Sequence, residues 1–238
     1  MPPPVTLVAV TTRLSERRTL VLLLALTSGT GIVDAACYLG LGRVFTGNMT
    51  GNVVILGMGL AGAEDLPVAG PLVALAGFFA GAALAGRFVR GRRGWGPWTS
   101  TVLGAVAVAL GGVAVALLVV DESPHQSFAL VLTAVLATAM GGQAAAARAV
   151  GFRELTTVAV TANLVGLASD TWPGRDSRQV GVARGLAVVA IVLGAAVGAL
   201  VVQWHLAAAV AAATAIVATV TVAAWAPTSP GAGPVPPG

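Results

Sequence analysis

Residues 31–52 read GIVDAACYLGLGRVFTGNMTGN, and this stretch restricts the fold more than any other part of the chain. It ends an apolar run that starts near residue 19, carries one carboxylate at Asp34, and continues into a segment rich in Gly, Thr and Asn. A carboxylate deep in a membrane span costs at least about 2.5 kcal/mol and therefore faces a cavity or a partner. Non-helical backbone at that depth also needs protein or water around it. The stretch predicts a membrane helix followed by an embedded polar loop.

The composition of the whole chain supports a membrane protein. Of the 238 residues, 57% are hydrophobic and 9% are charged, whereas soluble domains carry about 25% charged residues. The mean hydropathy is +0.91. So much apolar surface cannot be buried inside a soluble domain of this length, so a soluble globular protein is excluded and the lipid bilayer is the expected surrounding.

Apolar runs of about 20 residues are long enough to cross a bilayer. Six such runs lie at residues 19–40, 66–86, 99–120, 127–147, 180–202 and 206–225. Two shorter apolar segments, 46–62 and 156–169, begin with polar residues and are too short for a full crossing. We therefore predict an all-α polytopic membrane protein with six transmembrane helices and two short embedded half-helix segments.

These spans form one transmembrane domain, residues 19–225, with halves of about 19–120 and 127–225. Residues 1–18 are expected to be a cytoplasmic N-terminal tail whose first 12 residues are disordered. The Pro-rich and Gly-rich end, residues 226–238, is expected to be a disordered C-terminal tail.

The arginines set the expected orientation. All 13 basic residues are arginine, and six crossings with cytoplasmic termini place 12 of them on the inner side, which follows the positive-inside bias. If the short segments also crossed, the arginine cluster at residues 87–93 would lie outside. We expect a multi-pass protein of the bacterial cell (inner or plasma) membrane with both termini cytoplasmic. Loop arginines also account for the net charge of +4, so no nucleic acid partner is expected.

The two short segments resemble each other. Thr-Gly-Asn at residues 50–52 matches Thr-Ala-Asn at residues 161–163, an offset of 111. Three further identities share this offset: Gly40 with Gly151, Thr46 with Thr157, and Leu56 with Leu167. Three spans in each half would make the second half start from the opposite membrane face, an inverted 3+3 repeat of the kind found in transporters and channels. We expect Asn52 and Asn163 to approach each other near the midplane.

A Gly-x-x-x-Gly pair follows each short segment. Gly77 and Gly81 occupy the next long span of the first half, and Gly194 and Gly198 occupy that of the second half, at a slightly longer offset. Small residues at this spacing allow helices to approach closely in a membrane. We interpret both pairs as helix-packing surfaces.

The candidate binding or pathway residues are the polar residues of the two segments and of the spans before them. They are Asp34, Thr46, Asn48, Thr50, Asn52, Gln143, Thr157, Thr161 and Asn163. A half-helix that starts inside the membrane directs unpaired N–H groups at an anion or a polar ligand. The alternative is that the same side chains cap the half-helix and fix it to its neighbours.

Asp34 has no acidic counterpart in the second half, because position 145 is Ala, so any site is asymmetric. Asp34 either binds substrate or protons, or has a structural role. In the structural role it forms an ion pair with Arg148 or Arg184, or a protonated carboxyl bonded to a backbone carbonyl.

Residues 31–52, with Gly-x-x-Asp-Ala and Asn-Met-Thr-Gly-Asn, resemble the YoaK-like family of bacterial integral membrane proteins, also called domain of unknown function 1275. The resemblance covers residues 20–225. Residues 140–144, MGGQA, are similar to the Gly-x-Gln-Asn of that family, with Ala144 in the place of Asn. The resemblance implies a multi-spanning inner-membrane protein and implies no activity.

Function therefore rests on the residues. The repeat, the embedded segments and Asp34 favour a transporter or channel for an unidentified small molecule or ion, with a polar site between the two Thr-Gly/Ala-Asn segments. The alternative is a non-transporting membrane scaffold or assembly factor. No nucleophile elbow, phosphate loop, dinucleotide fingerprint or zinc spacing occurs in the chain. We expect no enzyme activity, no cofactor and no metal, and homo-oligomerisation remains open.

Overall fold

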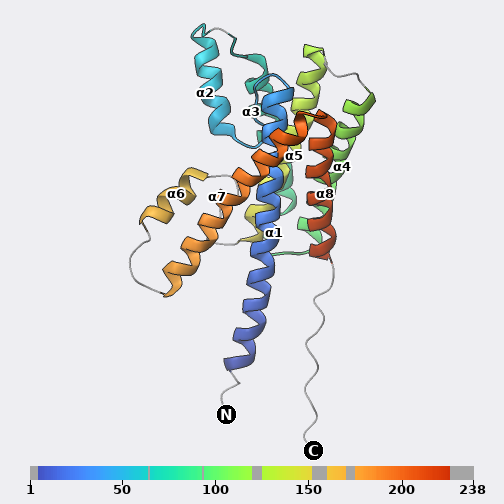
Figure 1. Cartoon of the computed structure of the whole chain (residues 1–238). Coiled ribbons are helices and arrows are strands. Elements are labelled where there is room, and N and C mark those ends of the chain that lie inside the picture. Colours follow the sequence, from blue (N-terminus) through green and yellow to red (C-terminus); the bar gives the residue numbers. More distant parts are fainter. Residues whose placement is uncertain are drawn as a thin grey trace, which may run out of the picture.

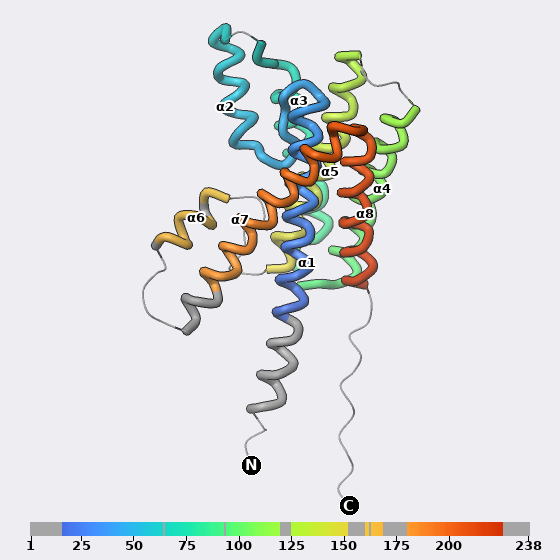
Figure 2. The backbone as a smooth tube through the Cα atoms, in the orientation of Figure 1, coloured from blue at the N-terminus to red at the C-terminus, as the bar shows by residue number. Residues whose placement is uncertain are grey.

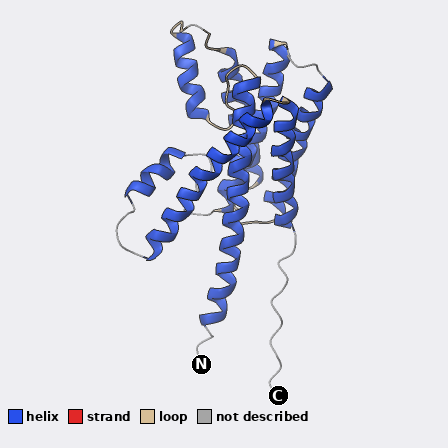
Figure 3. Cartoon of the chain, in the orientation of Figure 1, coloured by secondary structure: helices blue, strands red, loops and turns tan. Residues whose placement is uncertain are grey.

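The computed structural model describes residues 5–63, 65–92, 94–119, 125–151, 160–169 and 175–225. Within these ranges all regular structure is helical, without a strand (Figure 3). The helices are α1 (Val5–Gly40), α2 (Met49–Leu60), α3 (Ala69–Phe88), α4 (Pro97–Val119), α5 (Gln126–Val150), α6 (Val160–Ser169), α7 (Arg175–Val202) and α8 (Leu206–Trp225).

Six of these helices, α1, α3, α4, α5, α7 and α8, are long and apolar enough to cross a membrane. They are the six spans that the sequence predicts. In Figure 1, α1 begins and α8 ends at the same end of the bundle, where α3 is also connected to α4. An even number of crossings brings both ends of the bundle to one side.

The first helix extends further than predicted. α1 begins at Val5 and not near residue 19, so the prediction that residues 1–12 are disordered is wrong from Val5 onward. The reason is local: between Val5 and Arg18 the chain has neither Gly nor Pro, and Leu, Ala, Glu and Arg favour a helix. The predicted C-terminal tail, residues 226–238, lies outside the described residues.

The two short helices begin at matching positions. Met49 starts α2 and Val160 starts α6, 111 residues later, which is the offset of the sequence repeat. α2 packs on α3, and α6 packs on α7. Figure 2 shows α2 beside the half of the bundle farther from the termini and α6 beside the nearer half.

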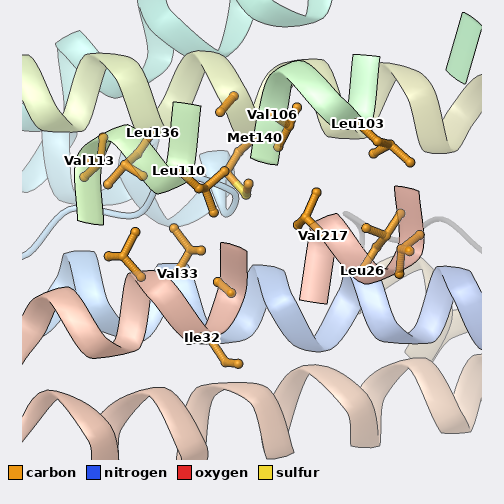
Figure 4. Close-up of a cluster of buried hydrophobic side chains, with 14 of the residues drawn as sticks. Leu26, Ile32, Val33, Leu103, Val106, Leu110, Val113, Leu136, Met140 and Val217 are labelled. Carbon is orange, nitrogen blue, oxygen red and sulfur yellow. The ribbon is translucent and has the colours of Figure 1, made fainter. Parts of the chain in front are cut away.

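The bundle centre is an apolar core made by α1, α4, α5 and α8 (Figure 4). It includes Leu26, Val33, Leu103, Leu110, Leu136, Met140 and Val217. Lipid is as apolar as these side chains, so close van der Waals packing, and not transfer from water, favours the assembly.

Glycines bring α1 and α7 into direct backbone contact. A Cβ on Gly31 would overlap Ile191 O, and a Cβ on Gly194 would overlap Ser28 O. A Cβ on Gly198 would lie 2.7 Å from Ile32 O. The crossing is therefore closer than any side chain allows, which confirms one predicted packing surface.

A backbone contact of the same kind joins α3 to α5. A Cβ on Gly141 would overlap Phe78 O, and a Cβ on Gly81 would overlap Thr138 O. A Cβ on Gly77 would lie 2.9 Å from Ala134 O. The second predicted packing surface is confirmed as well.

The two crossings correct the register of the repeat. Gly31 corresponds to Gly141 at an offset of 110, whereas Gly81 corresponds to Gly194 at an offset of 113. The sequence comparison paired Gly77 with Gly194, which is wrong by four residues. A motif that repeats every four residues still matches after a shift of one helical turn, so sequence alone selected the wrong pair.

Most of the packing is repeated when the halves are exchanged, although the contact of α7 with α8 has no comparable counterpart between α3 and α4. The contact of α1 with α7 matches that of α5 with α3, and the contact of α1 with α8 matches that of α5 with α4. The pair α2 and α3 likewise matches α6 and α7. Each half thus packs mainly through helices of the other half.

We predict that Gly81→Ala destabilises the protein and that Gly86→Ala, on the same helix, does not. A Cβ at Gly81 meets the backbone of α5, and overpacking of this kind costs about 1–3 kcal/mol. A Cβ at Gly86 meets no atom within 4 Å, and Ala favours a helix over Gly by about 1 kcal/mol. Thermal unfolding in detergent measures both; equal melting temperatures would contradict the proposed backbone contact.

Candidate functional site

The loop between α1 and α2, residues 41–48, turns the chain back along α1. Gly42 and Arg43 have φ angles of 90° and 58°, in the left-handed region that reverses the chain. The rings of Tyr38 and Phe45 stack with centroids 4.9 Å apart. Val44 and Thr46 are completely buried. The turn therefore places the loop backbone beside the buried face of α1.

Asp34 accepts the N–H groups of this loop. Its Oδ1 lies 2.8 Å from Thr46 N, 2.7 Å from Gly47 N and 3.4 Å from Thr46 Oγ1. Asp34 is 7% exposed. Hydrogen bonds to an ionised acceptor are about twice as strong as neutral ones, so the two backbone donors stabilise a carboxylate that would otherwise be costly in the membrane.

These contacts decide between the structural roles left open for Asp34. Its hydrogen bonds come from loop N–H groups, not from Arg148 or Arg184, and Arg148 is exposed at the end of α5. Both backbone hydrogen bonds are accepted by Oδ1, and in no hydrogen bond given for the described residues does Asp34 donate to a carbonyl. The sequence predicts unpaired N–H groups that face a ligand at the start of the half-helix; the N–H groups of Thr46 and Gly47, just before α2, are bound to the carboxylate of the protein itself.

Asn52 and Asn48 hold the start of α2. Asn52 is completely buried; its Nδ2 donates to Phe45 O at 2.6 Å, and its Oδ1 accepts from Phe45 N at 2.9 Å. Asn48 is the N-cap of α2 and accepts from Gly51 N at 3.2 Å. Thr50 is exposed on the first turn of α2. Asn52 and Asn48 thus act as the capping alternative describes.

Gln143 joins the cluster from α5. Its Nε2 donates to Thr30 Oγ1 at 2.9 Å, and Thr30 in turn donates to Leu26 O at 3.0 Å. The methyl group of Thr30 lies against Gly47, where a Cβ would be 2.6 Å from Thr30 Cγ2. The other amide atom, Gln143 Oε1, is buried and has no hydrogen-bond partner among the described residues.

We call Thr30, Asp34, Thr46, Gly47 and Gln143 the central polar cluster. The structure brings together three of the predicted site residues, Asp34, Thr46 and Gln143, and places Asn48, Thr50 and Asn52 beside them. Sequence reasoning missed Thr30. Its position four residues before Asp34 puts both on one face of a helix, and this spacing could have identified it.

The second segment contributes to a different place. Asn163 is 4% exposed on α6, Thr161 is exposed, and Thr157 lies outside the described residues. α6 packs on α7, and the guanidinium of Arg184 lies against Gly166. The hydrogen bonds of Asn52 go to Phe45 and Met49. These hydrogen bonds of Asn52 stay within its own segment and do not reach Asn163, to which the sequence predicts it to be close.

The corrected register of the repeat also changes which residue of the second half corresponds to Asp34. The offset of 110 between α1 and α5 puts Ala144, and not Ala145, at the equivalent position. Neither residue has a carboxylate, so the asymmetry between the halves remains. Among the described residues, no group of three His, Cys, Asp or Glu side chains could hold a metal ion.

Comparison with known proteins identifies the family of the chain. The family described as "Protein of unknown function (DUF1275)" matches residues 22–223, a range that includes the central polar cluster and most of the helical bundle. The chain belongs to this family. The transmembrane protein YoaK of Bacillus subtilis (strain 168) is 35% identical over 161 residues, 67% of this chain and 69% of the relative. No solved structure matches.

We predict that Gly47→Ala destabilises the protein and that adding Thr30→Ser restores much of the loss. The new methyl group collides with Thr30 Cγ2, and overpacking of a tight contact costs about 1–3 kcal/mol. Serine removes that methyl group but keeps the hydroxyl that Gln143 uses. Melting temperatures of the single and double variants measure the coupling. Additive losses would show that the loop does not rest on Thr30.

Proposed function

We propose that this integral membrane protein is a transporter or channel for a small polar molecule or ion and that the central polar cluster lines its pathway. The observation that carries the proposal is Gln143 Oε1, a buried acceptor that has no hydrogen-bond partner within the part of the chain that the structure describes. Buried polar atoms are nearly always paired, and an exception calls for an explanation such as a water molecule or an ion. A carboxylate in the same cluster makes a cation or a hydrogen-bond donor the favoured ligand.

The architecture supports the same proposal. We infer that the halves form an inverted repeat, because most helix contacts have a counterpart when the halves are exchanged and α2 and α6 start 111 residues apart. Inverted repeats with interrupted helices are common in transporters. The site we propose lies between α1, α5 and the loop before α2, and not between α2 and α6.

A non-transporting membrane scaffold or assembly factor is the second candidate. The hydrogen bonds of Asn48 and Asn52 end within their own segment, so these residues have a structural role without any ligand. Neither candidate requires a cofactor or enzymatic chemistry.

We further propose that the protein lies in the bacterial cell membrane with its termini in the cytoplasm. The arginines of the predicted loops support this orientation, and the relative YoaK is a bacterial transmembrane protein.

In a Cys37→Ala background, we predict that an impermeant maleimide labels Gln203→Cys in intact cells and labels Arg92→Cys only after permeabilisation. Gln203 lies between α7 and α8, Arg92 lies between α3 and α4, and both residues are exposed. Figure 1 shows these two connections at opposite ends of the bundle. Labelling of Arg92→Cys from outside would reverse the proposed orientation.

We predict that Gln143→Leu lowers transport by about tenfold or more, as expected for loss of a hydrogen bond to a bound ligand. A thermal-stabilisation screen of the purified protein against inorganic cations and small metabolites first identifies the ligand, and flux into proteoliposomes then measures transport. Gln203→Leu is the matched control, because Gln203 is exposed in a turn.

Asp34→Asn separates charge from shape, because the amide oxygen still accepts from Thr46 and Gly47. We expect it to fold and to lose flux. Flux that stays unchanged in both Gln143→Leu and Asp34→Asn would refute a pathway through the cluster and favour the scaffold.

A further inference from the structure

A groove of about 600 Å³ lies between α3, α4 and α5, and none of its lining residues belongs to the central polar cluster. It forms because α3 and α4 each pack against α5 rather than against one another. Its walls include Leu84, Phe88, Ala105, Ala109 and Val135. The volume is in the range of pockets that bind small molecules, about 300–1,000 Å³.

Apart from two threonines, the groove is lined by apolar residues. Its two threonines use their hydroxyls on their own helices: Thr101 Oγ1 donates to Pro97 O at 2.8 Å, and Thr138 Oγ1 donates to Ala134 O at 2.7 Å. The proton of each hydroxyl is therefore already used within its own helix. The groove suits a hydrocarbon chain.

The length of the groove corresponds to one leaflet of a bilayer. Its lining on α4 runs from Thr101 to Ala109 and on α5 from Ala134 to Gly142. Eight residues of helix rise about 12 Å, and half of a hydrocarbon core of about 30 Å is about 15 Å. A chain lying in the groove would thus reach from one membrane surface to near the midplane.

Arginines lie at the surface end of the groove. Phe88 lines that end and packs edge-on against Trp98, with ring centroids 5.3 Å apart. The guanidinium of Arg92 lies 3.8 Å from the Trp98 ring centroid and also donates to Phe88 O. Arg87 and Arg90 are exposed in the same region, at the end of α3. Positive charge therefore stands where the headgroup of a lipid would be.

We propose that this groove binds an anionic phospholipid, with an acyl chain against α3, α4 and α5 and the phosphate at Arg87, Arg90 and Arg92. Basic pockets between membrane helices bind anionic headgroups by this complementarity. A second copy of the chain fits less well, because a two-fold interface pairs the same patch on both subunits and would bring the arginine clusters toward each other.

Native mass spectrometry tests the proposal. The full chain is reconstituted into nanodiscs with equal amounts of phosphatidylglycerol and phosphatidylcholine, extracted into detergent, and analysed for retained lipid. We expect phosphatidylglycerol to be retained in preference to phosphatidylcholine. Arg87→Gln/Arg92→Gln should lower that preference by roughly tenfold or more. The charge-matched control, Arg17→Gln/Arg43→Gln, changes two exposed arginines on segments that do not line the groove and should leave the preference unchanged.

A second pair of variants tests the acyl chain. Ala105→Phe fills the groove and should reduce retention of both lipids, whereas Val108→Phe, on the outward face of α4, should not. Ala105→Leu adds less volume and serves where the Phe variant does not fold. Equal retention of the two lipids by the wild type, equal effects of the test and control variants, or a dimer that disappears with Ala105→Phe would overturn the proposal.

Discussion

The hydrogen bonds from Thr46 N and Gly47 N to the Asp34 carboxylate determine how the first half of the bundle is built. A carboxylate in hydrocarbon needs donors, and a non-helical loop in hydrocarbon needs acceptors. The loop N–H groups are the donors that the carboxylate needs, and the carboxylate is the acceptor that the loop needs. Because both groups are buried, the loop must follow α1 closely, and this fixes the point at which α2 begins.

The second constraint is the pair of glycine crossings. Gly31 with Gly194, and Gly81 with Gly141, let backbones meet where no side chain would fit. Each crossing joins a helix of one half to a helix of the other half. The first helix of each half is thereby held against the third helix of its counterpart, so neither half has its packing partners without the other. Gln143 reaches Thr30 because this arrangement also brings α5 beside α1.

The groove and the central polar cluster show two consequences of the same packing. Where α1 and α5 meet the loop, polar groups are enclosed and one acceptor, Gln143 Oε1, stays unpaired. Where α3 and α4 diverge on α5, the surface is apolar and open, and arginines stand at its end. The first place suits a polar ligand, and the second suits a lipid.

The sequence predicts the six crossing helices, the two short helices and their common offset, because hydropathy and span length are properties of local sequence. It also identified Asp34, Thr46 and Gln143 as residues of one region. It could not determine that Asp34 accepts the N–H groups of its own loop, since that depends on a chain reversal at Gly42 and Arg43. It selected the wrong glycine pair, because a four-residue motif matches itself after one helical turn, and only contacts between backbones fix the register. The contact of Thr30 with Gln143 depends on the packing of α1 beside α5. The separation of α2 from α6 likewise follows from tertiary packing, because α2 packs on α3 and α6 packs on α7.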